Sequence, residues 1–249
     1  MRAPRVHTDQ PLAADRLLTL EDGPSHHVAR VLRMTAGSSL VLFNGDGREY
    51  PARIVALQGR RVQVETGPAR CPVRESPLSI HLGQAVSRGE RMDYTLQKSV
   101  ELGVTRITPL WSRRTQVKLE GRRLDKRMQH WRGVIVAACE QSGRTRLPEL
   151  APPATLADWC RRRQAAQLGL VLDPGAGQSL LRALDHDGAE ILLLSGPEGG
   201  FDERELDTAR SAGFTGVRLG PRILRTETAA LAALAALQTL WGDFQETSD

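Results

Sequence analysis

Short runs rich in apolar residues mark the first part of the chain. They cover residues 39–43, 50–57 and 62–64, separated by the Asn-Gly-Asp-Gly of 44–47 and the Gln-Gly of 58–59, and apolar and polar positions alternate within 50–57. Asn and Gly tolerate the positive φ angles of tight turns, and the alternation suits strands with one buried face. The pattern predicts a small β-meander or barrel.

A short helical pattern precedes these strands. Between residues 25 and 33, Val28, Val31 and Leu32 recur at the i, i+3, i+4 spacing of one helix face, and Ser25 stands where an N-cap would be. We therefore expect an amphipathic helix. Its outer face would present three basic residues, His27, Arg30 and Arg33.

Residues 67–77 interrupt the pattern, because three prolines fall within eleven residues that have no periodicity. We expect a domain boundary there, with one domain over 1–70 and another over 71–249. Beyond it, apolar runs (78–82, 107–110, 168–172, 191–194 and 216–219) alternate with helical segments (91–102, 122–142, 155–165, 203–212 and 227–240). This alternation predicts an α/β fold with a mostly parallel sheet covered on both faces.

Composition and charge narrow the class of protein. The 249 residues are 40% hydrophobic and 25% charged, which excludes collagen-like, disordered and disulfide-scaffold proteins. The net charge is +5, but residues 106–132 hold nine basic and two acidic residues, whereas 133–249 hold eleven basic and sixteen acidic. Basic side chains gain affinity by displacing counterions from phosphates, although an arginine run also suits a solvated helix face. The distribution favours a phosphate-bearing partner for the first half.

Cysteines, histidines and apolar stretches exclude several other classes. Cys71, Cys139 and Cys160 are odd in number and far apart, which supports neither a disulfide framework nor a zinc knuckle. The six histidines include no H-x-x-x-H pair, so no metal is expected. The longest apolar stretch, 229–237, is far shorter than the roughly 20 residues that span a bilayer, and the N-terminus lacks a signal-peptide core. We expect a cytoplasmic protein.

Three loops that combine Gly and Pro follow three of the expected strands. They are residues 173–177 (DPGAG), 196–200 (GPEGG) and 220–228 (GPRILRTET). Open parallel sheets bind ligands beyond the carboxyl ends of their strands, where Gly lets the backbone approach a ligand and Pro limits the freedom of the loop. Neither G-x-x-x-x-G-K-[ST] nor G-x-G-x-x-G occurs. These loops are the candidate ligand site.

Several strings together resemble the RsmE-type 16S ribosomal RNA (uracil-N3)-methyltransferases of the SPOUT superfamily. They are residues 97–104 (QKSVELGV), 138–144 (ACEQSGR), 196–200 and 219–229 (LGPRILRTETA), with 1–5 and 30–34 near the N-terminus. The resemblance covers essentially the whole chain. It implies an N-terminal PUA-like β-barrel followed by a SPOUT domain with a C-terminal trefoil knot, a homodimer, and S-adenosylmethionine as cofactor.

The same resemblance implies which residues bind the cofactor, chiefly through backbone groups of the three loops. They are Leu172, Gly196, Leu219, Gly220, Pro221, Ile223, Leu224 and Arg225. The residue types are compatible with this, because adenine would lie among the aliphatic side chains while amides of the Gly turns satisfy its edge. Asp173, Gly175 and Gly177 depart from the family pattern.

Methylation at uracil N3 requires loss of a proton whose pKa is far above neutral. A base could remove it, or a cation could stabilise the charge that grows on O2 or O4. Glu198 and Arg225 are the candidates, and we favour Arg225 because a carboxylate is a weak base for this proton. Glu140 and Arg144 are second choices.

The target uridine must be unpaired or flipped, because N3 lies on the Watson-Crick edge. We expect small-subunit ribosomal RNA, or the subunit itself, to contact basic residues of both domains. These are Arg2, Arg5, His27, Arg30, Arg33, Arg113, Arg114 and Lys118.

Two other functions compete with this one. A non-catalytic RNA-binding protein of ribosome assembly needs only the basic barrel, and it predicts no affinity for a cofactor. A Rossmann-type small-molecule methyltransferase would read its cofactor through residues 173–177, and it predicts that Asp173→Ala removes binding.

Overall fold

The computed structural model describes residues 3–115, 120–183 and 190–245. Within these ranges the chain forms two compact units. The first unit comprises residues 1–75 together with 136–147, and the second comprises 76–135 and 148–249. The segment 136–147 therefore groups with the N-terminal residues, although residues 76–135 separate them in the chain.

The first unit contains a five-stranded sheet with the order β1-β3-β4-β5-β2. Its strands are β1 (Arg5–His7), β2 (Leu17–Thr19), β3 (Ser39–Phe43), β4 (Tyr50–Gln58) and β5 (Arg61–Thr66). The β3–β4 and β4–β5 pairs are antiparallel, as the alternation predicts, whereas β1 pairs with β3 in parallel. Leu40, Leu42, Ile54, Val62 and Val64 form its core.

The helix in the structure differs from the one predicted over residues 25–33. Helix α1 spans Asp22–His26, and one π-helical turn follows over His27–Val31. Ser25 is not the N-cap, because it lies inside α1 and its hydroxyl donates to the carbonyl of Leu20. Val28 is buried, whereas Val31 is 59% exposed, so the two do not share one buried helix face.

The second unit is built on an all-parallel sheet with the order β12-β10-β11-β6-β7-β8, and β9 also pairs with β7. The strands are β6 (Ile80–Ala85), β7 (Arg106–Trp111), β8 (Glu149–Leu150), β9 (Ala154–Thr155), β10 (Leu168–Leu172), β11 (Ile191–Ser195) and β12 (Thr215–Val217). The prediction of a parallel sheet is confirmed. Because β12, β10 and β11 are adjacent and parallel, the loops that follow them emerge at one edge.

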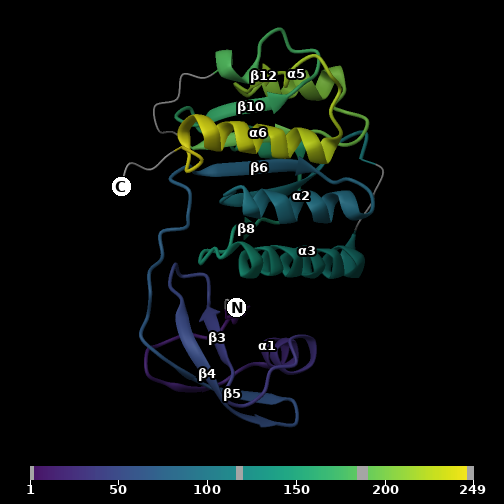
Figure 1. Ribbon diagram of the computed structural model, residues 1–249. Helices are drawn as coiled ribbons and strands as arrows, with labels where there is room; N and C mark the ends of the chain where they lie inside the picture. Colours follow the sequence, from purple (N-terminus) through teal and green to yellow (C-terminus); the bar gives the residue numbers. More distant parts are fainter. Residues whose placement is uncertain (1–2, 116–119, 184–189, 246–249) are drawn as a thin grey trace. The chain divides into compact units, whose positions relative to one another are not determined.

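Helices cover both faces of this sheet (Figure 1). The helices of this unit are α2 (Glu90–Glu101), α4 (Leu156–Arg161), α5 (Glu203–Ser211), α6 (Thr226–Trp241) and the part of α3 (Gly121–Ser142) that precedes residue 136, with a short 3-10 helix over Leu180–Ala183. Helices α2 and α6 pack side by side. On the other face, α4 and α5 bury Trp159 and Leu206 against Val171, Leu192 and Leu194 of β10 and β11. The alternate residues of these strands thus face α6.

Candidate functional site

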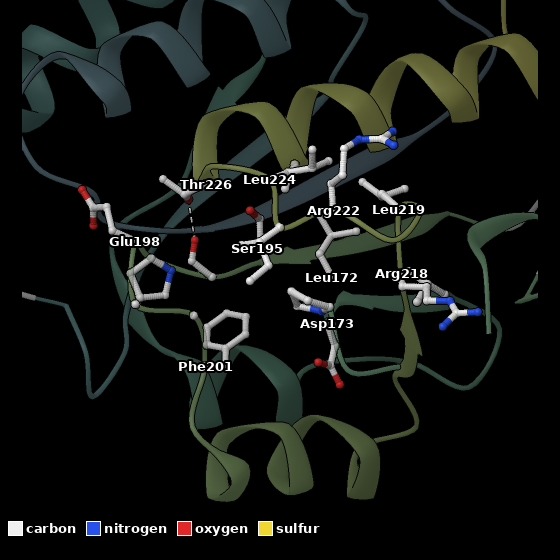
Figure 2. Close-up of a pocket in the computed structure, with 18 of the residues that line it drawn as sticks. Leu172, Asp173, Ser195, Glu198, Phe201, Arg218, Leu219, Arg222, Leu224 and Thr226 are labelled. Atoms are coloured by element: carbon white, nitrogen blue, oxygen red, sulfur yellow. Dashed lines mark hydrogen bonds between the residues drawn. The ribbon is translucent and has the colours of Figure 1, made fainter. Parts of the chain in front are cut away.

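A cavity of about 330 Å³ opens at the edge where β10, β11 and β12 end. The loops after all three strands line it, together with the first turns of α6 (Figure 2). The volume falls within the range of small-molecule sites, about 300–1,000 Å³. The convergence of the three Gly/Pro loops is therefore a feature of the folded second unit.

Most residues predicted to bind a cofactor line this cavity. Six do so: Leu172, Gly196, Leu219, Gly220, Ile223 and Leu224. Pro221 and Arg225 are not among the lining residues. Ile223 is 87% exposed, so it contributes at the mouth rather than in the interior. Gly220 has a φ of 73°, a conformation that glycine adopts without strain and that lets the third loop turn sharply.

Several lining residues were not predicted. Ser195 ends β11 and is completely buried, and its hydroxyl has no hydrogen-bond partner among the described residues. Phe201, Leu206 and Ala229 add apolar surface, and Arg218 and Arg222 extend away from the centre of the pocket in Figure 2. Only the position of Ser195 at the end of an apolar run could have indicated its role, because a polar residue there faces the ligand edge.

Asp173 also lines the cavity, directly after β10. One carboxylate oxygen accepts from the backbone amide of Gly175 at 2.8 Å, and the other lies 3.4 Å from the guanidinium of Arg210 on α5. In Figure 2 its side chain points towards α5. The carboxylate is therefore engaged within the protein, while the residue still forms part of the pocket surface.

Glu198 lies at the outer end of the second loop and points away from the pocket centre (Figure 2). Its Oε1 accepts from the backbone amide of Arg88 at 2.8 Å and from the guanidinium of Arg91 at 2.9 Å. Partial burial disfavours the charged form, but these donors outweigh it and hold the pKa of Glu198 below its usual value. A carboxylate that is ionised and committed in this way is a poor general base.

Arg225 directly precedes α6 and is exposed. It does not line the cavity, although its neighbours Leu224 and Thr226 do. The Thr226 hydroxyl donates to the carbonyl of Gly196 at 2.5 Å and accepts from Gln84 Nε2 at 3.1 Å. The start of α6 is thereby fixed to the second loop, with Arg225 just outside.

The second-choice catalytic residues belong to the first unit. Glu140 Oε1 accepts from the backbone amide of His7 at 2.9 Å, and burial raises the pKa of Glu140. Arg144 forms an ion pair with Glu75 at 2.8 Å. Neither lines the cavity of the second unit.

The residues predicted to contact RNA fall into three groups. Arg30 and Arg33 are exposed and His27 is half-buried beside them in the first unit. Arg5 is buried, where it pairs with Glu49 and donates to the carbonyl of Arg144, so it offers no free surface to a phosphate. Arg113 and Arg114 belong to the second unit and are exposed, whereas Arg2 and Lys118 lie outside the described residues.

No helix in residues 3–115, 120–183 and 190–245 is long and apolar enough to cross a membrane. No group of three or more His, Cys, Asp or Glu side chains there is arranged to hold a metal ion.

Comparison with known proteins places this geometry in a family. Residues 74–238 match the RNA methyltransferase domain family, and residues 20–66 match the RNA methyltransferase PUA domain family. The ribosomal RNA small subunit methyltransferase E of Buchnera aphidicola (subsp. Schizaphis graminum) is 34% identical over 242 residues, which cover 97% of this chain and 98% of the relative.

Two solved structures resemble the chain over nearly its full length. One is a ribosomal RNA small subunit methyltransferase E from Neisseria gonorrhoeae, solved with bound S-adenosylmethionine. It is 40% identical, with a TM-score of 0.92, and the match covers 98% of this chain and 100% of that one. A Legionella pneumophila protein, also solved with that cofactor, is 42% identical with a TM-score of 0.94 at 98% and 100% coverage. The chain belongs to the ribosomal RNA small subunit methyltransferase E family, with an RNA methyltransferase domain and a PUA domain.

Proposed function

We propose that this protein transfers a methyl group from S-adenosylmethionine to N3 of a uridine in small-subunit ribosomal RNA, which gives 3-methyluridine. The observation that carries the proposal is the cavity at the ends of β10, β11 and β12, built by the loops that the sequence singles out. The relatives from N. gonorrhoeae and L. pneumophila, solved with this cofactor, support the choice of methyl donor.

The residues of the cavity suit the donor. Leu172, Leu219 and Leu224 offer an apolar surface for adenine, and the amides of the Gly turns can satisfy its polar edge. No group in the described part of the chain pairs with the buried Ser195 hydroxyl, and a buried polar group ordinarily costs stability unless a ligand or water pairs with it. When bound, S-adenosylmethionine supplies an electrophilic methyl carbon on a sulfonium sulfur.

We assign the stabilisation of the uracil anion to Arg225. N3 becomes nucleophilic when its proton is lost, and the resulting negative charge spreads onto O2 and O4. The guanidinium of Arg225 is exposed next to Leu224 and Thr226, so it is available to a base presented at the mouth. Glu198 is held as a carboxylate by Arg88 and Arg91, which argues against it as the group that takes the proton.

RNA binding is assigned to residues 1–70 and methyl transfer to residues 71–249. The exposed Arg30 and Arg33 are the basic residues of the first unit that we retain for phosphate contacts. The three converging loops are proposed to form a trefoil knot. We also propose a homodimer, for which light scattering should report twice the 27.3 kDa of one chain.

One incubation tests the function against its competitors. The protein is mixed with S-adenosylmethionine and small ribosomal subunits that lack the modification, the RNA is digested, and nucleosides are identified by mass spectrometry. New 3-methyluridine is the expected product. Methylation at another atom would overturn the assignment of N3. RNA binding without donor uptake would instead favour the non-catalytic assembly protein, and donor uptake that Asp173→Ala alone abolishes would favour the Rossmann-type alternative.

A further inference from the structure

The second loop of the pocket, residues 196–200, is held from several sides by groups of the second unit. Thr226 bonds the carbonyl of Gly196, as described above. The carboxylate of Glu198 receives the Arg88 amide and the Arg91 guanidinium. The carbonyl of Gly199 accepts from Arg114 Nη1 at 2.6 Å. Three of the five residues in this turn are thus bonded to distant parts of the chain.

Arg114 contacts the turn through its stem as well as its charged end. A Cβ atom built on Gly199 would lie 3.3 Å from Arg114 Cδ, so the aliphatic chain lies directly against the glycine. The neighbouring Arg113 anchors the same segment, because its amide donates to Glu205 at 2.7 Å and its guanidinium lies 3.4 Å from Asp202. Asp202 and Glu205 form the capping box of α5, which follows the turn directly.

Neither Arg91 nor Arg114 lines the cavity. Both instead bond residues of the turn that do line it, Arg91 through the Glu198 carboxylate and Arg114 through the Gly199 carbonyl. A turn with three glycines in five residues loses much conformational freedom when it is fixed in one shape. Bonds that fix it before the ligand arrives reduce the entropy lost on binding.

We propose that Arg91 and Arg114 are positioning residues that hold the 196–200 turn in its cofactor-binding shape from outside the pocket. The inference rests on the proposed function, since it takes the ligand of the pocket to be S-adenosylmethionine. It gives Arg114 a role besides the expected contact with RNA. It also gives Glu198 a role as the partner of Arg91 rather than as a base.

Titration calorimetry with S-adenosylmethionine, without RNA, tests the inference on the full-length protein. Arg114→Ala and Arg91→Ala should each weaken donor binding by about tenfold, the effect of losing one charge-assisted hydrogen bond. Arg204→Ala is the matched control, because Arg204 is an exposed arginine of α5 outside this set of contacts. It should bind the donor within about twofold of wild type, the scatter of surface substitutions.

Two further readouts separate positioning from a general loss of stability or charge. Arg114→Lys keeps a donor for the Gly199 carbonyl and should recover part of the affinity that Arg114→Ala loses. With RNA present, the alanine variants should raise the KM for the donor more than they lower kcat. Thermal melting of the apo-proteins should change little, because both arginines bond partly exposed groups.

The outcomes are distinct. Wild-type affinity in both alanine variants would overturn the inference and leave the proposed function intact. An equal loss in Arg204→Ala would also overturn it, because the effect would then be one of charge alone. A wild-type protein that takes up no donor would overturn the proposed function and this inference with it.

Discussion

The Arg5–Glu49 pair of the first unit and His81 of the second unit are ionisable groups that are buried in different ways. In the first unit, Arg5 and Glu49 form an ion pair with side chains only 6% and 8% exposed, and Arg74 joins the same carboxylate at 3.1 Å. In the second unit, His81 lies in the core, where its Nε2 is within hydrogen-bond distance of Thr108 and of the Trp159 indole. The charges of Arg5 and Glu49 are paired, whereas His81 is buried as a neutral ring.

The arginines of this chain likewise lie in different surroundings and have separate tasks. Arg5 and Arg144 stabilise the first unit through Glu49 and Glu75. Arg91 and Arg114 bond the pocket turn of the second unit, and Arg225 stands exposed beside the pocket. Substitutions at these positions should therefore affect stability, donor binding or turnover separately.

The largest expected effect comes from breaking the buried pair of the first unit. Glu49→Ala would leave Arg5 without its carboxylate in a buried site, which should lower the free energy of unfolding by about 3–5 kcal/mol. Guanidinium denaturation followed by circular dichroism measures this loss. Glu65→Ala, at an exposed position of β5, should stay within about 0.5 kcal/mol of wild type. Equal stability of the two variants would show that the buried pair contributes little.

Arg225→Ala should have the next largest effect, and chiefly on turnover. Loss of a group that stabilises transition-state charge lowers kcat by about 100-fold or more. Donor affinity should remain within about tenfold of wild type, because Arg225 does not line the cavity. Single-turnover methylation and donor titration measure the two quantities. Normal turnover would remove Arg225 from the mechanism.

The buried histidine of the second unit predicts a loss of stability in acid. Burial, together with the nearby Arg106, lowers the pKa of His81 from 6.5 to about 4. Between these values the unfolded chain binds a proton that the folded protein does not, so stability is complete above pH 6.5 and falls as the pH drops towards 4. From pH 7 to pH 5 this amounts to about 2 kcal/mol.

His81→Gln provides the control for that prediction. Denaturation of wild type and variant at both pH values isolates the histidine, because all other titrating groups are shared. The free-energy gap between the two proteins should change by about 2 kcal/mol across this range. A gap that does not depend on pH would show that His81 titrates normally in the folded state.

The smallest expected effect concerns the exposed arginines of the first unit. Reversing Arg30 and Arg33 to Glu should weaken RNA binding by about tenfold and reduce the slope of log affinity against log salt by about 1.5, because two phosphate contacts are lost. Filter binding over a salt series measures both. An unchanged slope would exclude this surface from the RNA contact.

Much of the second unit could be predicted, because short apolar runs bounded by Gly and Pro are a strong local signal. The predicted run 191–194 and strand β11 begin at the same residue, and 203–212 differs from α5 at its end by one residue. Strand β6 was predicted to end too early, at Leu82. The strand continues through Gly83, where Trp159 fills the space that a side chain would take. The next residue, Gln84, is buried, and its Nε2 donates a hydrogen bond to the Thr226 hydroxyl.

The contacts that define the site were harder to predict. The three loops carry a local Gly/Pro signal, so their place at the edge where the cavity opens followed from the sequence. Arg91 and Glu198 are 107 residues apart in the chain, and no local pattern indicates that they pair. Strands β1 and β2 have three residues each, too few for a period to show. The burial of Arg5 likewise depends on Glu49, 44 residues away.

A crystal structure of the protein grown with S-adenosylmethionine tests the central claim most directly. We predict that the donor lies among the loops after β10, β11 and β12, with its adenine between Leu172, Leu219 and Leu224 and its methyl group facing the side of Arg225. A donor bound at any other place, or an empty cavity in protein saturated with it, would contradict the account.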